Sequence, residues 1–208
     1  MLELLQSSRL WIRLTARCSK VVERVLIIGP CGAGKSILAV ELAKRLALPV
    51  HHLDQLHWHP GWIEGSNDDL VRKLEVILAG ERWLIDGNYG GSLALRLTRA
   101  DTVIYLDYPI RLCVMRLLRR IAIWRGRTRP DMTDGCPERF DLEFLVYLLR
   151  WNSGPRLRTE QHLRGHEGRM VRFRRPAELD AWLATLPLAS LDRRAISPSV
   201  PPTGGVSP

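Results

Sequence analysis

The sequence has no long apolar run and few cysteines. No stretch approaches the roughly 20 consecutive apolar residues that a membrane-spanning helix needs, so we expect no membrane partner. The four cysteines, Cys18, Cys31, Cys113 and Cys136, are scattered, with neither a CxxC pair nor the spacing of a metal site. Because no secretory signal of the usual kind is present, a reducing cytoplasm is the expected location.

Lysine is also scarce, since the chain has 4 Lys against 27 Arg within a net charge of +9. The positive excess is local, because segment 111–175 alone holds 16 Arg, no Lys and 7 acidic residues. A basic segment can bind nucleic acid. It can equally bind a polyphosphate, because Arg grips phosphate oxygens in a bidentate way. A general preference for Arg over Lys does not explain why the excess is local.

The length of 208 residues favours one domain, which we place at residues 21–187. Residues 1–20 are interpreted as a poorly ordered leader. Arg9, Arg13 and Arg17 would share one helical face there, so a membrane-surface helix or a transit peptide is the alternative. Residues 188–208 become rich in Pro, Ser and Gly and are predicted to be a disordered tail.

Between these ends, strand-like apolar runs alternate with helical patterns. Strands are predicted at 25–28, 49–53, 83–85, 102–106 and 170–173, and helices at 37–46, 67–79, 109–125, 140–149 and 176–186. A polar loop punctuated by Pro and Gly is predicted at 127–137. The alternation predicts an α/β fold of three layers, with about five parallel strands and helices on both faces.

A glycine-rich segment directly follows the first predicted strand and opens a helix. It matches GxxxxGK[ST], the P-loop of nucleotide-binding proteins, in the context that this motif requires. Its glycines let backbone N–H groups point at phosphate oxygens, and the helix adds its positive end. Lys35 is expected to reach the β- and γ-phosphates of ATP, and Ser36 to hold Mg²⁺. The predicted ATP-binding residues are Gly29, Pro30, Cys31, Gly32, Ala33, Gly34, Lys35 and Ser36.

Carboxylates follow three of the predicted strands, at the edge where parallel sheets bind ligands. Asp54 and Asp86 can orient or deprotonate an acceptor hydroxyl, or reach Mg²⁺ through water. Either residue can instead cap a turn. Asp107 precedes Tyr108 and Pro109 and is interpreted as the cap of the next helix.

The loop after Asp54 contains Trp58 and Trp62 among Pro and Gly. Two tryptophans there can offer a flat face to a base, or they can pack against the core. Four histidines lie nearby, but without a cysteine and without the spacing of a known zinc site: His51, His52, His57 and His59.

Arginines surround the predicted loop at 127–137. Phosphoryl transfer builds negative charge on the moving group, which Arg or Lys opposes. A mobile loop carrying arginines can also close over the reactants and exclude water. We therefore favour an Arg-rich lid at about 125–139 over a merely solvated basic face. The arginines concerned are Arg120, Arg125, Arg127, Arg129 and Arg139.

Taken together, these motifs resemble the small P-loop kinases of the adenylate, shikimate and gluconate kinase type. More closely, the chain is similar to the bacterial family labelled "DNA topology modulation protein" or adenylate kinase-related kinase. The likeness runs from about Arg24 to Leu186 and rests on segments 29–36, 52–62, 83–89 and 125–140.

The resemblance implies a P-loop NTPase core, an acceptor-binding region at about 54–80 and a lid at about 125–139. It implies that Asp54 and Asp86 face the acceptor and Mg²⁺, and that some of the five lid-region arginines clamp phosphates. Adenylate kinases have an acidic-Gly-aromatic-Pro stretch where this chain has Asp86-Gly87-Asn88-Tyr89, which argues against AMP as the acceptor. The pair Arg129-Pro130 is similar to the shikimate kinase lid, whereas the rest of that substrate site is not evident.

The resulting hypothesis is an ATP- and Mg²⁺-dependent phosphotransferase acting on a small molecule or a nucleotide. The alternative is a regulatory P-loop NTPase that binds nucleic acid through its Arg-rich face, and a third is a nucleotide-binding protein without turnover. The kinase is favoured because the chain is short for a motor-type ATPase and no strand ends in an Asp-Glu pair. The basic segment also coincides with the expected lid.

Overall fold

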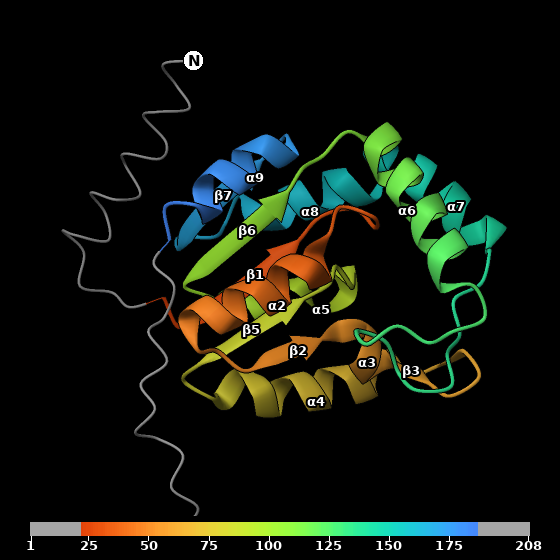
Figure 1. Cartoon of the computed structure of the whole chain (residues 1–208). Helices are drawn as coiled ribbons and strands as arrows, with labels where there is room; N and C mark the ends of the chain where they lie inside the picture. The colour runs from red at the N-terminus through yellow and green to blue at the C-terminus, as the bar shows by residue number, and fades with distance from the viewer. Residues whose placement is uncertain (1–21, 187–208) are drawn as a thin grey trace, which may run out of the picture.

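A computed structural model describes residues 22–186, so the predictions for the leader at 1–20 and the tail at 188–208 lie outside the described residues. Figure 1 shows one parallel sheet with helices packed on both of its faces. This confirms the predicted α/β, three-layer P-loop NTPase fold. Within residues 22–186, no helix is both long enough and apolar enough to span a bilayer.

Five parallel strands form the sheet, in the order β2-β5-β1-β6-β7. They are β1 (Arg24–Ile28), β2 (Val50–His52), β5 (Trp83–Asp86), β6 (Thr102–Leu106) and β7 (Arg169–Phe173). From the central β1 the chain runs to the edge strand β2, returns to β5 beside β1, and then crosses β1 to continue with β6 and β7, so the direction of strand addition reverses at β1. A ligand crevice is expected at this reversal, off the carboxyl end of β1. A separate antiparallel pair is formed by β3 (Trp58–His59) and β4 (Ile63–Glu64).

The helices cover two separate apolar clusters, and the alternation of side chains along β1 explains why. Val25 and Ile27 face the cluster with α2, α6 and α9, whereas Leu26 and Ile28 face the cluster with α4, α5 and α8. The helices are α2 (Lys35–Leu46), α3 (Leu53–His57), α4 (Asn67–Ala79), α5 (Gly90–Arg99), α6 (Ile110–Trp124), α7 (Leu142–Leu149), the 3₁₀ turn η1 (Trp151–Ser153), α8 (Pro155–Leu163) and α9 (Pro176–Leu183).

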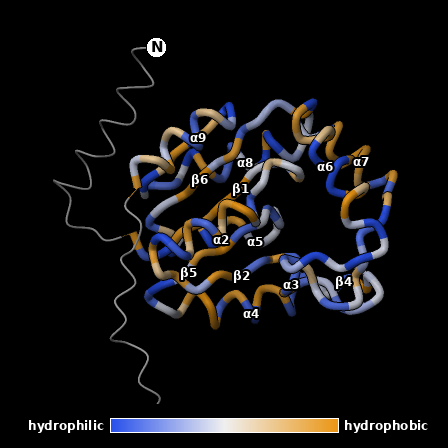
Figure 2. Tube along the Cα trace, in the orientation of Figure 1, coloured by the Kyte–Doolittle hydropathy of each residue, from blue (hydrophilic) through white to orange (hydrophobic). Residues whose placement is uncertain are grey.

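The helix α4 shows how local sequence sets these elements. Ser66 caps its start, with its hydroxyl oxygen accepting a hydrogen bond from the Asp69 N–H at 3.1 Å. Leu70, Leu74 and Leu78 recur at helical spacing and are buried, and the tube in Figure 2 alternates between apolar and polar residues along α4. The helix predicted at 67–79 is therefore confirmed.

Several predicted boundaries were wrong. The second strand ends at His52, and Asp54 lies in the first turn of α3 instead of following a strand. The helix predicted from Phe140 begins at Leu142, because the Asp141 side chain caps it by accepting from the Phe144 N–H. The last helix ends at Leu183 instead of Leu186.

The helices α5 and α8 and the β3–β4 hairpin were not predicted. The start of α5 is Gly90-Gly91, and glycine is a poor helix former. The helix α8 is short and mostly polar, so its apolar periodicity is weak.

Candidate active site

The P-loop lies between β1 and α2, pressed against the start of α6. Gly32 has φ +76, a left-handed conformation that favours glycine. A Cβ atom at this position would lie 2.2 Å from the carbonyl oxygen of Cys113 on α6. Backbone conformation and close packing therefore both require glycine here. Arg116 also donates to the Ala33 carbonyl at 3.1 Å, a second link between α6 and the P-loop.

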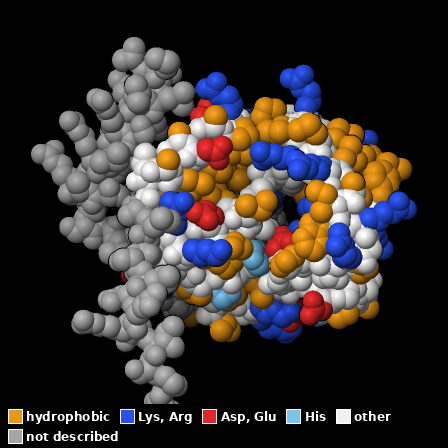
Figure 3. Space-filling view, in the orientation of Figure 1, with side chains coloured by type: hydrophobic (Ala, Val, Ile, Leu, Met, Phe, Trp, Pro, Cys, Tyr) orange, Lys and Arg blue, Asp and Glu red, His pale blue; other side chains and the backbone are white. Residues whose placement is uncertain are grey.

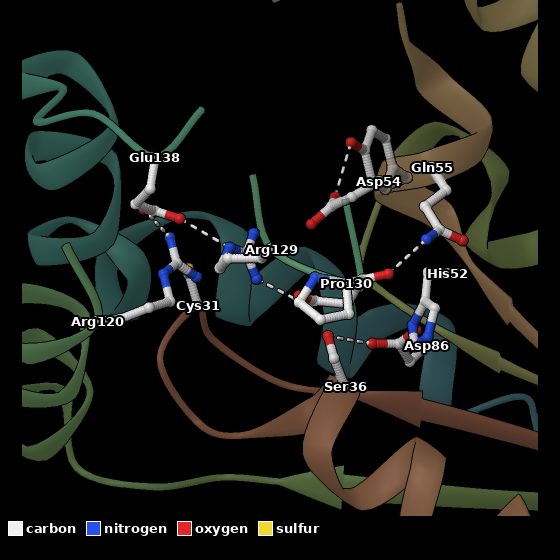
Figure 4. Close-up of polar contacts among 12 residues, drawn as sticks. Cys31, Ser36, His52, Asp54, Gln55, Asp86, Arg120, Arg129, Pro130 and Glu138 are labelled. Atoms are coloured by element: carbon white, nitrogen blue, oxygen red, sulfur yellow. Dashed lines mark hydrogen bonds and ion pairs between the residues drawn. The ribbon is translucent and has the colours of Figure 1, made fainter. Parts of the chain in front are cut away.

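Lys35 and Ser36 open α2 at the mouth of the sheet. The Lys35 ammonium donates to the Pro30 carbonyl at 3.1 Å, within the loop itself. The Ser36 hydroxyl donates to Asp86 Oδ2 at 2.8 Å, and Asp86 Oδ1 lies 2.5 Å from His52 Nδ1 (Figure 4). Asp86 is the last residue of β5 and is only 3% exposed. One buried carboxylate thus joins α2, β5 and β2.

The oxygen atoms at this position suit Mg²⁺. Mg²⁺ prefers hard oxygen ligands and usually keeps several waters, so the Ser36 hydroxyl and the nearby Asp86 carboxylate fit it. Over the part of the chain that the structure describes, no group of three or more His, Cys, Asp or Glu side chains is placed to hold a metal. Phosphate oxygens and water would therefore have to supply the remaining ligands, as in other sites that bind Mg²⁺ with ATP.

The residues after Asp86 join the P-loop to α3. Asn88 Oδ1 accepts from the Gly29 N–H at 2.9 Å, and its amide N–H donates back to the Gly29 carbonyl. The Tyr89 hydroxyl donates to Asp54 Oδ1 at 2.9 Å. Gly87 packs so closely that a Cβ atom there would lie 2.8 Å from Leu53 Cβ. Of these residues only Asp86 was predicted to have a function, although the unbroken segment 86–89 at a strand end was the signal for the others.

Arg96 on α5 holds this segment in place. It is fully buried and donates to the carbonyl oxygens of Gly87 at 3.0 Å and Tyr89 at 3.1 Å, and also to that of Asn88. Burial lowers the pKa of Arg96 to about 9, against the opposing charge of Asp86. Sequence reasoning missed this residue because it did not predict α5.

Burial and neighbouring charges shift the pKa values of three acidic or basic groups at the site. Burial raises the pKa of Asp54, although the charges of Lys35 and Arg129 and the hydrogen bond from Tyr89 oppose the shift. Burial would lower the pKa of His52, but the hydrogen bond and charge of Asp86 outweigh it and raise the value. Burial acts against ionisation of Asp131, yet the Arg129 charge and a hydrogen bond with Ser36 lower its pKa.

The predicted lid at about 125–139 rests on the loop that contains β3 and β4. Gln55 donates to the Pro130 carbonyl at 2.8 Å, the Gly61 N–H to the Gly135 carbonyl at 2.9 Å, and the Trp62 indole to the Pro137 carbonyl at 2.9 Å. Trp62 thus contacts the lid, with Trp58 edge-on at 5.4 Å between ring centroids. These contacts join the loop at 55–62 to the segment predicted to be a lid.

The lid-region arginines fall into two groups. The Arg120 guanidinium lies 3.6 Å from Cys31 Sγ of the P-loop, and Arg129 pairs with Asp131 at 2.6 Å. The other three are exposed and make their contacts elsewhere. Arg127 donates to the Ile123 carbonyl and lies over Trp124, Arg139 lies over Trp62, and Arg125 forms a backbone bridge with Glu138.

Part of the positive excess is paired inside the molecule. Asp107 accepts from Arg156 at 2.9 Å and lies 3.7 Å from Arg172. The interpretation of Asp107 as a helix cap was wrong, because α6 begins at Ile110, its N-cap residue is Pro109, and no side chain caps it. Figure 3 shows a hollow between the sheet and α6, with basic and acidic side chains around its rim.

No family model matches the sequence, and no curated protein matches it. Several solved structures are similar to this chain. A shikimate kinase from Bacteroides thetaiotaomicron is 15% identical, with 78% of this chain and 94% of that chain covered and a TM-score of 0.47. A gluconokinase from Sinorhizobium meliloti 1021 is 18% identical, with 79% and 93% covered and a TM-score of 0.46. At these identities and TM-scores the likeness assigns no activity and does not decide the narrower family resemblance.

The Asn88 contact should be needed for the ATP binding that the P-loop motif predicts. Asn88→Ala removes both hydrogen bonds to Gly29 and leaves the first P-loop amide without its partner. We expect about 10-fold weaker ATP binding by calorimetry, since losing one partner of a buried hydrogen bond costs about 1–3 kcal/mol. The exposed Asn152→Ala is the matched control. Equal ATP affinity in the two folded variants would contradict the assigned contact.

Proposed function

We propose that this chain is an ATP- and Mg²⁺-dependent phosphotransferase that acts on a small molecule or a nucleotide. The observation that carries the proposal is the meeting of the Ser36–Asp86 pair, the Asp54 carboxylate and Arg129 around one P-loop. A phosphoryl transfer needs a cradle for the donor, a carboxylate at the acceptor and cations for the moving group. The charges of Lys35 and Arg129 both act on Asp54, which supports their working together.

The donor side is proposed as follows. The backbone N–H groups of segment 29–34 and the positive end of α2 would hold the ATP phosphates, with Lys35 at the β- and γ-phosphates. Ser36 would hold Mg²⁺ directly, and Asp86 through water. When bound, Mg²⁺ would offset negative charge on the phosphates. Asp86 also orients the Ser36 hydroxyl, because it accepts that proton at 2.8 Å.

Asp54 is proposed to orient the acceptor hydroxyl and to accept its proton. Its raised pKa brings it closer to the operating pH, which favours proton transfer. The Tyr89 hydroxyl fixes the orientation of the carboxylate. The lid, which rests on the acceptor-side loop, would exclude water during transfer. Transfer to water, which would waste ATP, is thereby opposed.

Arg120 and Arg129 are proposed to stabilise the transferring phosphoryl group, because they are the two predicted arginines at the site. Arg125, Arg127 and Arg139 make other contacts and are assigned to lid structure. Several arginines pair with acidic residues of the chain itself. They are Arg120, Arg129, Arg156 and Arg172. This pairing disfavours a free basic surface that would bind nucleic acid.

Lys35→Ala tests the donor assignment. We expect a folded protein that loses transfer to every acceptor in a screen read by ADP release. Removing one charge-assisted phosphate contact costs on the order of 2–5 kcal/mol, most of it in the transition state. Lys44→Ala, on the exposed part of the same helix, should behave as wild type. Unchanged turnover in Lys35→Ala would refute the proposed donor site.

Arg129→Ala and Arg127→Ala form a matched pair within the lid. We expect Arg129→Ala to lower the transfer rate by roughly 10²-fold and Arg127→Ala to change it by less than about threefold. Turnover should also be the same with and without duplex DNA. A nucleic-acid-dependent NTPase would show the reverse, namely DNA-stimulated hydrolysis that survives Arg129→Ala.

Tyr89→Phe tests Asp54 through its pKa. The Tyr89 hydrogen bond lowers the pKa of Asp54, so its removal raises that pKa further. The proton-accepting carboxylate then forms only at higher pH, and the acid limb of the kcat profile should move upward by up to about one pH unit. Tyr147→Phe, on a half-exposed ring of α7, should leave the limb in place. If the acid limbs of wild type and Tyr89→Phe coincide, Asp54 is not the proton acceptor.

A further inference from the structure

Glu138 lies between the two arginines that approach the P-loop. Its side chain is buried, with the residue only 5% exposed. Glu138 Oε1 is 2.9 Å from Arg120 Nη2, and Glu138 Oε2 is 2.7 Å from Arg129 Nε (Figure 4). Each oxygen therefore serves a different guanidinium, one from α6 and one from the lid.

The backbone of Glu138 also closes the base of the lid. Its N–H donates to the Arg127 carbonyl at 2.9 Å, and its own carbonyl accepts from the Gly126 N–H at 3.1 Å. The backbone of Glu138 is thus fixed against the residues that directly follow α6, and this fixes the starting point of its side chain. Its position is fixed by main-chain contacts as well as by the arginines.

Polar contacts continue from Glu138 toward the P-loop in both directions. On one side, Arg120 Nη1 lies 3.6 Å from Cys31 Sγ. On the other side, Arg129 Nη1 lies 2.6 Å from Asp131, which is close enough to Ser36 that Ser36 helps to lower its pKa. The two guanidiniums therefore flank the loop that would cradle the phosphates, and Glu138 is the group that they share.

Two guanidiniums this close to one carboxylate repel each other, and a buried carboxylate between them offsets that repulsion. Glu138 uses one nitrogen of each guanidinium, while each guanidinium has five N–H donors in a rigid fork. Each guanidinium has a second contact as well, Arg120 with Cys31 and Arg129 with Asp131, and two contacts restrict the rotation of the planar fork. The remaining donors then have a defined direction, which electrostatic stabilisation of a transition state requires.

We propose that Glu138 is a positioning residue that holds Arg120 and Arg129 where their remaining N–H groups meet the transferring phosphoryl group. This inference rests on the proposed phosphotransferase function and adds to it a residue that touches neither substrate. Neutralising Glu138 should therefore weaken the transition state more than the binding of ATP.

Glu138→Gln keeps the size of the side chain and removes its charge. We expect kcat to fall by about 10²-fold, while KM for ATP and the melting temperature change little. Glu138→Asp keeps the charge but shortens the reach, so its kcat should lie between those of wild type and Glu138→Gln. In a double-mutant cycle, Arg129→Ala should cost much less in the Glu138→Gln background than in wild type. Glu143→Gln, on an exposed side chain of α7, is the charge-matched control.

A folded Glu138→Gln variant with the kcat of Glu143→Gln would overturn the inference, as would strictly additive effects with Arg129→Ala. If Glu138→Gln does not fold, Glu138→Asp is measured in its place. A wild-type kcat in Glu138→Asp would then overturn the inference. A selective rise in KM for ATP with unchanged kcat would also overturn it, because that pattern belongs to ground-state binding.

A second readout separates this inference from the proposed function. ADP with aluminium fluoride imitates the transferring phosphoryl group, and we expect wild type to bind it more tightly than ADP alone. Glu138→Gln should lose that gain and bind ADP alone as wild type does. If wild type transfers phosphate to no acceptor, the proposed function fails, and loss of the gain in Glu138→Gln still supports the inference. Equal gains in wild type and variant, or no gain in wild type, would overturn it.

Discussion

The site depends on one buried carboxylate, Asp86. Its two oxygens join Ser36 at the start of α2 to His52 at the end of β2, and it is itself the last residue of the strand between them. A buried carboxylate is stable only with hydrogen-bonding partners, so the three elements are held in a fixed relation at the mouth of the sheet. The next three residues continue this role toward Gly29 and Asp54, and Arg96 supports all of them from α5.

The segment 125–139, which is proposed to be a lid, contacts the loop at 55–62 through neutral hydrogen bonds and α6 through an ion pair. Its contacts with the loop at 55–62 are mainly to backbone carbonyls, and their strength depends little on ionic strength. Its ion pair with α6 joins Glu138 to Arg120, and Arg129 pairs with Asp131 and Glu138 inside the segment itself. A triphosphate bound at the P-loop would add negative charge near these ion pairs. It should therefore change the ion pairs more than the neutral hydrogen bonds.

The fold could be predicted from sequence to the extent that it depends on local patterns. The P-loop, the strands and α4 follow from a motif, apolar runs and a capping serine, each contained within a few residues. The helix α5 begins with two glycines, which conceal it, and Arg96 was missed with it. Which arginines lie at the site could not be predicted, because all of them have the same chemistry and differ only in where the folded segment places them. Arg120 and Arg129 lie there, whereas Arg127 and Arg139 do not. Glu138 likewise depends on a contact with Arg120, which is distant in the chain.

Because Gly32 packs against Cys113, a change at the P-loop can be transmitted along α6 to its other end. Near its start this helix touches the P-loop through Cys113 and Arg116, and its far end at Trp124 leads into the lid. Between Cys113 and Trp124 the helix is about 16 Å long, so a tilt of about 10° would move the far end by about 3 Å. The length of α6 is equally constrained. One inserted residue would turn Arg120 by about 100° around the helix axis and carry it away from Cys31.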